Sequence, residues 1–77
     1  MESTYSKQAE AFLEKQTDKQ SARIKRAIST LPAGDVKKLR SIKDGYRLRV
    51  GKIRVLFVKN RDEIHIVQID NRGDIYK

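Results

Sequence analysis

The 77-residue sequence contains no cysteine and one proline, and it has no hydrophobic run long enough to cross a membrane. Without cysteine the chain forms neither a disulfide nor a thiolate metal site, so a reducing compartment is permitted. The first residues, Met1 to Ser6, are too polar for a signal peptide, so we expect a cytoplasmic protein. The length predicts a single domain, residues 1–77, with a small core and a thin margin of stability.

Acidic residues are scarce in the second half of the chain. Between Lys37 and Arg61 there are ten basic residues and only one acidic residue, Asp44, whereas the whole chain carries a formal net charge of +8. A basic segment of this kind predicts a polyanion, an acidic protein, or both as partners. The excess of positive charge is therefore concentrated in residues 37–61.

Residues 46–57 alternate apolar and basic side chains on both sides of a glycine, which predicts a β-hairpin. If Gly51 and Lys52 form a two-residue type II′ turn, the apolar residues share one face, with the pairs Tyr46–Phe57, Leu48–Val55 and Val50–Ile53. The same register places Arg49 opposite Arg54, with Arg47 on the same side. Like charges directly opposite each other are destabilising, so this face is predicted to bind an anion.

The other elements are predicted from caps, turns and periodicity. Ser6 is a candidate N-cap for a helix over residues 7–16, and a capping box from Thr17 to Gln20 opens a second helix over 18–31. Pro32 and Gly34 end that helix. Strands are expected at 2–5, around 36–42, and at 45–50, 53–59 and 63–70, with a short extended tail at 75–77. Because residues 63–70 are rich in Ile and Val, we expect this strand to be central and covered on much of both faces.

The order β-α-α-β-β-β predicts an α+β fold, in which an antiparallel twisted sheet carries an N-terminal helix pair on one face. The apolar face of the hairpin is expected to meet the apolar residues of the two helices, which are Phe12, Leu13, Ile24, Ile28 and Leu31.

The basic face of the hairpin has the chemistry of a phosphate site. Guanidinium groups bind phosphate bidentately and stay charged at any working pH. Arg72 and Tyr76 lie just past the last long strand, where they can join Arg47, Arg49 and Arg54. RNA cleavage there needs no metal, because the 2′-hydroxyl beside the phosphate is an internal nucleophile. Further phosphate contacts are expected from lysines outside this cluster, namely Lys37, Lys38, Lys43, Lys52 and Lys59.

Each of these residues also has a simpler interpretation. An alternating basic face is ordinarily a solvated sheet surface. Tyr76 is a candidate packing aromatic, and Arg72 a candidate partner of its acidic neighbours Asp70 and Asp74. The lone histidine, His65, is expected to be structural, and we expect no metal site.

Four segments together resemble the RelE branch of the RelE/ParE superfamily of type II toxin–antitoxin toxins: Lys38–Leu39, Gly45–Gly51, Ile53–Phe57 and Ile69–Tyr76. The most specific part is the combination of Tyr-Arg-x-Arg-Val-Gly with Arg-x-x-x-Tyr. The resemblance covers nearly the whole chain.

The resemblance implies a RelE-type fold and a ribosome-dependent mRNA interferase that cleaves mRNA on the ribosome and halts translation. It implies a cognate antitoxin as regulator, and a toxin–antitoxin complex that binds operator DNA. Arg54 and Arg72 fall at phosphate-binding positions, Tyr76 falls at the catalytic tyrosine, and Arg47 and Arg49 fall where some members carry lysine. An arginine does not readily take over proton transfer from a lysine, so charge stabilisation is the role expected of Arg47 and Arg49.

Two alternatives belong to other functional classes. ParE-like relatives share the scaffold and inhibit DNA gyrase without the arginine–tyrosine set, so that set favours RNA cleavage here. A non-catalytic toxin-fold component, active as an antitoxin-bound repressor, is the second alternative.

Overall fold

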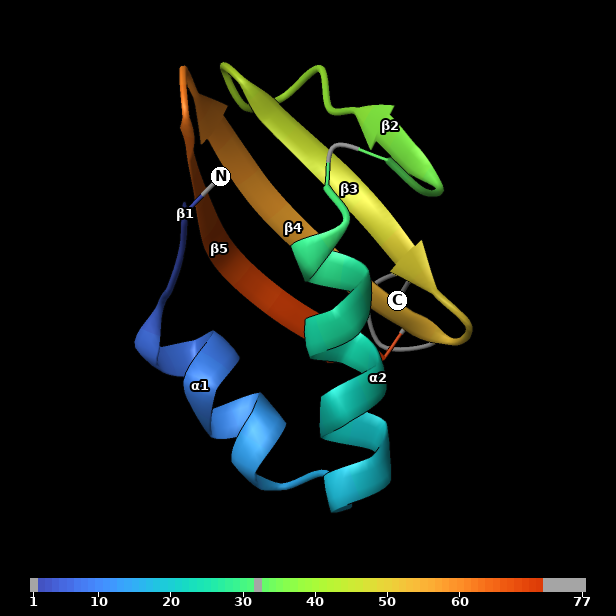
Figure 1. Cartoon of the computed structure of the whole chain (residues 1–77). Coiled ribbons are helices and arrows are strands. Elements are labelled where there is room, and N and C mark those ends of the chain that lie inside the picture. The colour runs from blue at the N-terminus through green and yellow to red at the C-terminus, as the bar shows by residue number, and fades with distance from the viewer. Residues whose placement is uncertain (1, 32, 72–77) are drawn as a thin grey trace.

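The computed structural model describes residues 2–31 and 33–71, which form two helices and a five-stranded sheet. The elements are β1 (Glu2–Tyr5), α1 (Lys7–Glu14), α2 (Asp18–Ser29), β2 (Val36–Lys38), β3 (Gly45–Val50), β4 (Ile53–Asn60) and β5 (Glu63–Asn71). The strand order across the sheet is β1-β5-β4-β3-β2. Figure 1 shows both helices on one face of the sheet. The α+β class predicted from the sequence is confirmed.

The sheet is mixed rather than wholly antiparallel. It has five strands, whereas the predicted order β-α-α-β-β-β contains four. β1 runs parallel to β5, while the other neighbouring strands are antiparallel. The helix pair carries the chain from β1 at one edge of the sheet to β2 at the other edge (Figure 1).

Both helices begin at the predicted caps. The hydroxyl of Ser6 accepts a hydrogen bond from the backbone N–H of Ala9, and the hydroxyl of Thr17 accepts one from that of Gln20. The helices end at Glu14 and Ser29, two residues before the predicted ends at 16 and 31. Neither helix among the described residues is long and apolar enough to cross a membrane.

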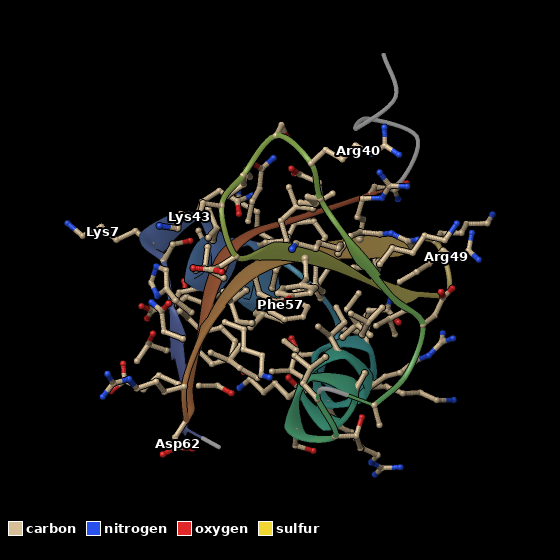
Figure 2. All side chains as sticks on the ribbon, turned by 90° about the horizontal axis from the view of Figure 1, so that it is seen from above. Lys7, Arg40, Lys43, Arg49, Phe57 and Asp62 are labelled. Carbon is tan, nitrogen blue, oxygen red and sulfur yellow. The ribbon has the colours of Figure 1, made fainter. Side chains whose placement is uncertain are left out.

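The core lies between the helices and the sheet. α1 packs against β5 and β1, and α2 packs against β3. Figure 2 shows Phe57 inside the molecule, while Lys43, Arg49 and Asp62 lie at its periphery. The rings of Tyr46 and Phe57 stack with centroids 5.5 Å apart. The buried residues include most of those predicted to meet in the core: Leu13, Ile24, Ile28, Leu31, Leu48, Ile53, Val55 and Phe57.

The hairpin has the predicted register. Arg49 pairs with Arg54, and the three apolar pairs of residues 46–57 occupy one face. Gly51 has φ +60°, and Lys52 is not among the described residues with positive φ, as a type II′ turn requires. A side chain at position 51 would also meet the guanidinium of Arg23, whose Nη2 lies 3.0 Å from an ideal Cβ.

β5 differs from its prediction because it contains a β-bulge. Leu56 pairs with Gln68 and Phe57 pairs with Ile66, so Val67 is the extra residue. Ile64 and Ile66 are buried before the bulge, and the next buried residue after it is Ile69. Val67 is 37 % exposed. The prediction that β5 is covered on both faces is therefore wrong, and the central strand of the sheet is β4.

β2 is also shorter than predicted. It ends at Lys38, and residues 39–44 form the connection to β3. A turn closes this connection, because the N–H of Gly45 donates to the carbonyl of Ile42 at 3.0 Å and Asp44 has φ +58°. The next strand, β3, begins at Gly45, as predicted for the strand over residues 45–50.

Candidate functional site: the arginine face

The candidate site is the face of the sheet opposite the helices, and we call the group Arg47, Arg49 and Arg54 on it the arginine face. The side chains of successive strand residues point to opposite faces, so Leu48 enters the core while Arg47 and Arg49 point away from it. Arg54 lies directly opposite Arg49 in the register. The structure therefore brings together the three arginines that the sequence predicted to share a face.

The three arginines have different surroundings. Arg47 is flanked by Lys37 on β2 and Leu56 on β4, and its side chain is only 7 % exposed. Arg49 is exposed, and Arg54 is half-buried. On its other side Arg54 pairs in register with Asp70 of β5. The face thus carries one buried, one half-buried and one exposed guanidinium.

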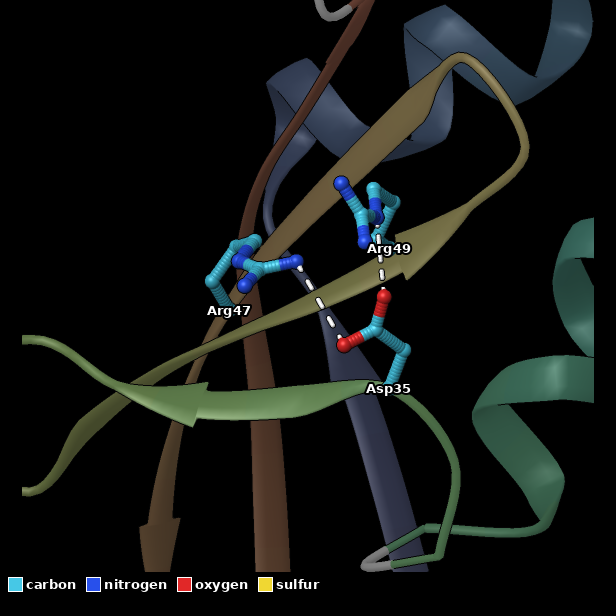
Figure 3. Close-up of polar contacts among 3 residues, drawn as sticks. All are labelled: Asp35, Arg47 and Arg49. Atoms are coloured by element: carbon cyan, nitrogen blue, oxygen red, sulfur yellow. Dashed lines mark hydrogen bonds and ion pairs between the residues drawn. The ribbon is translucent and has the colours of Figure 1, made fainter.

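A carboxylate that the sequence analysis did not single out connects two of these arginines. Asp35 Oδ2 accepts a hydrogen bond from Arg49 Nε at 2.8 Å, and Asp35 Oδ1 lies 3.9 Å from Arg47 Nη1 (Figure 3). The backbones of the same two residues are also hydrogen-bonded, since the Arg49 N–H donates to the Asp35 carbonyl at 3.0 Å. The signal in the sequence was the position of Asp35 directly before a strand that pairs with β3.

The electrostatics of Asp35 reflect these contacts. The hydrogen bond from Arg49 and the positive charges of Arg49, Arg47 and Lys37 hold the pKa of the Asp35 carboxyl below its usual range. Asp35 is therefore a carboxylate at neutral pH, and it neutralises part of the positive charge of the arginine face.

The predicted lysines do not all lie on this face. Lys37 does, since it pairs with Arg47, whereas Lys38 and Lys59 pair with Tyr46 and Ile64 and so alternate to the helix side of the sheet. Lys43 lies in the connection between β2 and β3, and Lys52 lies in the hairpin turn. Figure 2 places Lys43 on the side of the molecule away from Arg49. Of these five lysines, Lys37 is the one that pairs in register with a residue of the arginine face.

The two remaining predicted residues, Arg72 and Tyr76, lie outside the described residues. His65 has a structural contact, as expected, because its Nδ1 lies 2.7 Å from the hydroxyl of Thr4 on β1. Within residues 2–31 and 33–71, no group of three His, Asp or Glu side chains is placed to hold a metal ion.

No protein-family model matches the chain, and no curated protein matches it. Solved structures do match. The crystal structure of the RelB–RelE antitoxin–toxin complex from Methanococcus jannaschii superposes with a TM-score of 0.77 at 25% identity, covering 95% of this chain and 94% of that chain. The archaeal RelE–RelB complex from Pyrococcus horikoshii gives a TM-score of 0.78 at 25% identity, covering 94% of each chain.

A third match extends the fold to a bacterial protein. The solution structure of the conserved hypothetical protein HP0894 from Helicobacter pylori has a TM-score of 0.63 at 10% identity, covering 95% of this chain and 96% of that chain. At this identity the likeness concerns the fold alone. The two archaeal matches, at 25% identity, are structures of RelE–RelB complexes, in agreement with the resemblance to RelE in the sequence. The chain therefore has a RelE-like fold, and its structural neighbours support its identification as a RelE-like toxin.

Proposed function

We propose that this protein is the toxin of a type II toxin–antitoxin system and acts as a ribosome-dependent mRNA interferase in the cytoplasm. A fold alone does not determine an activity, so the proposal depends on the site. The observation that carries it is the arginine face, where Arg47, Arg49 and Arg54 share one side of the sheet with Arg49 and Arg54 directly opposed. Like charges directly opposite each other are destabilising, so a face with three guanidinium groups attracts an anionic ligand in addition to Asp35.

The chemistry that fits this face is cleavage of an RNA phosphodiester. The 2′-hydroxyl gives up its proton and attacks the adjacent phosphorus, the bond from phosphorus to the 5′-oxygen breaks, and the 5′-oxygen takes up a proton. The products are a 2′,3′-cyclic phosphate and a 5′-hydroxyl. Arg54 and Arg49 stabilise the additional negative charge of the transition state. In this proposal Arg72 contributes a further phosphate contact and Tyr76 takes part in proton transfer, both by resemblance to the family.

The proposal includes the partners. The structural neighbours from Methanococcus jannaschii and Pyrococcus horikoshii are complexes of RelE with RelB. We therefore propose a cognate antitoxin that neutralises this chain, with operator DNA bound through the antitoxin complex. Ribosomes and translated mRNA are the proposed targets.

The test is Arg54→Ala in a translating extract. Wild-type protein is expected to cut a reporter mRNA at codon-phased positions, mapped by primer extension, and not to cut the same mRNA when initiation is blocked. Because Arg54 stabilises charge in the transition state, its removal is expected to slow cutting by about a hundredfold or more. Arg26→Ala is the matched control, since Arg26 is an exposed arginine on α2, on the other side of the sheet.

Two results would contradict the proposal. One is cutting by Arg54→Ala at the wild-type rate. The other is inhibition of DNA gyrase in a supercoiling assay without any cutting of mRNA, which would assign the chain to the ParE-like class.

A further inference from the structure

Arg47 is a buried cation that has no close hydrogen-bond partner within residues 2–31 and 33–71. Its side chain is 7 % exposed, and its Nη1 makes no hydrogen bond with the described part of the chain. A buried charge is costly unless it is paired and hydrogen-bonded. Among the described residues the nearest anionic atom is Asp35 Oδ1 at 3.9 Å, which is an ion-pair distance and too long for a hydrogen bond. The guanidinium of Arg47 is therefore only partly compensated.

Asp35 is held by Arg49 and faces Arg47. Its two oxygens are divided between the two guanidinium groups, as Figure 3 shows. Phosphate oxygens bind guanidinium groups in the same way, and a phosphate has more oxygens to share than a carboxylate. The position of the Asp35 carboxylate is thus the place where an external phosphate would meet both arginines.

The contact between Asp35 and Arg49 is open to solvent. The side chain of Asp35 is 45 % exposed and that of Arg49 is 41 % exposed. Exposed ion pairs contribute little net free energy because water screens them, so an external anion can replace the carboxylate at low cost. Since the exposed carboxylate of Asp35 lies 3.9 Å from the buried Arg47 Nη1, an anion that takes its place comes within ion-pair distance of Arg47 Nη1.

We propose that Asp35 occupies a phosphate subsite between Arg47 and Arg49 and is displaced from it by a backbone phosphate of RNA. In the free protein Asp35 compensates the two arginines, and in the complex the phosphate takes its place. Asp35 therefore competes with the ligand. The inference builds on the proposed function, because RNA is the ligand which that function supplies.

The experiment compares Asp35→Asn with wild type. Asparagine keeps an oxygen that accepts from Arg49 Nε and removes only the negative charge, so the arginine is still held in place. Inorganic phosphate is titrated into ¹⁵N-labelled full-length protein while the Nε–H signal of Arg49 is followed by NMR. In parallel, fluorescence anisotropy measures the affinity for a labelled trinucleotide RNA with 2′-O-methyl riboses, which cannot be cleaved.

Asp35→Asn is expected to bind both probes about two- to fivefold more tightly, the range expected for loss of an exposed charge pair. Asp62→Asn is the matched control. It removes the same charge from the turn between β4 and β5, and Figure 2 shows Asp62 on the opposite side of the molecule from Arg49. Its affinity is expected to stay near that of wild type. A thermal melt confirms that each variant is folded, and Asp35→Ser repeats the test with a smaller side chain.

The results separate this inference from the proposed function. Unchanged or weaker RNA binding by Asp35→Asn overturns the inference, even if the wild-type protein cuts mRNA, because Asp35 would then only position the arginines. Tighter binding supports it. Tighter binding by a protein that cuts no mRNA keeps the subsite and rejects the proposed activity.

Discussion

Arg47 and Arg49 share one carboxylate but depend on it differently. Arg49 is exposed, so water replaces Asp35 if the contact breaks, whereas Arg47 is buried between β2 and β4. Removing one partner of a buried charge leaves the other charge uncompensated. Asp35 therefore stabilises the folded chain in two ways, mainly through its hydrogen bond and ion pair with Arg49 and additionally by partly compensating the buried charge of Arg47.

This dependence predicts how the free energy of unfolding responds to acid. The pKa of Asp35 is lower in the folded chain than in the unfolded chain, mainly because of the hydrogen bond from Arg49. Its contribution is therefore present above the unfolded pKa of about 3.9 and is lost as the pH falls through the folded pKa. Urea unfolding between about pH 5 and pH 2 is expected to show a smaller loss of stability for Asp35→Asn than for wild type.

The other carboxyl groups are common to both proteins, so the difference between the two profiles isolates Asp35. Asp62→Asn serves as the control for the loss of one carboxyl group. Identical acid profiles for wild type and Asp35→Asn would show that Asp35 does not stabilise the folded chain.

Among the elements, the first turn of α1 continues the edge of the sheet where β1 stops. β1 pairs with β5 only as far as Tyr5 and Ile66. Beyond that point the side-chain amide of Gln8 replaces a strand, since its Nε2 donates to the Ile69 carbonyl at 2.9 Å and its Oε1 accepts from the Ile69 N–H at 2.9 Å. The hydroxyl of Ser6 donates to the carbonyl of Val67 at the bulge. α1 is thus fixed to β5 by polar contacts as well as by the core.

Gln8→Ala is expected to lower the free energy of unfolding by about 1–2 kcal/mol, because two backbone groups of Ile69 lose their partner at once. Urea unfolding at neutral pH measures the change. Gln20→Ala is the control, because it makes the same truncation in the first turn of α2, where no side-chain hydrogen bond of Gln20 occurs among the described residues. Equal effects of the two substitutions would show that Gln8 does not act as a strand partner.

The sequence predicted the hairpin register and the extent of β5 to within one residue, but it did not predict which side chains of β5 are buried. A two-residue turn with Gly51 at its first position determines the register of both strands, so Arg49 must oppose Arg54. The bulge at Val67 depends instead on how β5 pairs with β4, and local periodicity does not contain that information.

The same limit applies to the candidate site. Alternation places Arg47, Arg49 and Arg54 on one face, and this part was predictable from residues 46–57. The contact from Asp35 joins residues 14 positions apart and depends on how the chain enters β2. Charge alone also did not separate Lys37 from Lys38, because the face on which each lies follows from the pairing of a short edge strand.

For the whole molecule, the excess of positive charge lowers the free energy of unfolding, whereas burial of the small core raises it. The net charge is +8, and ten of the basic residues lie between Lys37 and Arg61. The charges on the sheet repel one another, and this repulsion subtracts from the modest stability that a domain of this size obtains from burial. An anion that binds to the folded chain at the arginine face would reduce this repulsion and would thereby raise the free energy of unfolding.

We therefore expect the thermal midpoint of the isolated protein to rise by about 3–6 °C between roughly 20 and 200 mM sodium chloride, because salt screens the repulsion between exposed charges. Sodium phosphate at the same ionic strength is expected to raise the midpoint further, because it also binds between Arg47 and Arg49. Scanning calorimetry or thermal circular dichroism measures both effects. A midpoint that falls with added chloride would mean that screened attractions, such as that between Asp35 and Arg49, outweigh the repulsion. Equal thermal midpoints in chloride and phosphate would mean that screening alone explains the rise. The arginine face would then have no preference for phosphate over chloride.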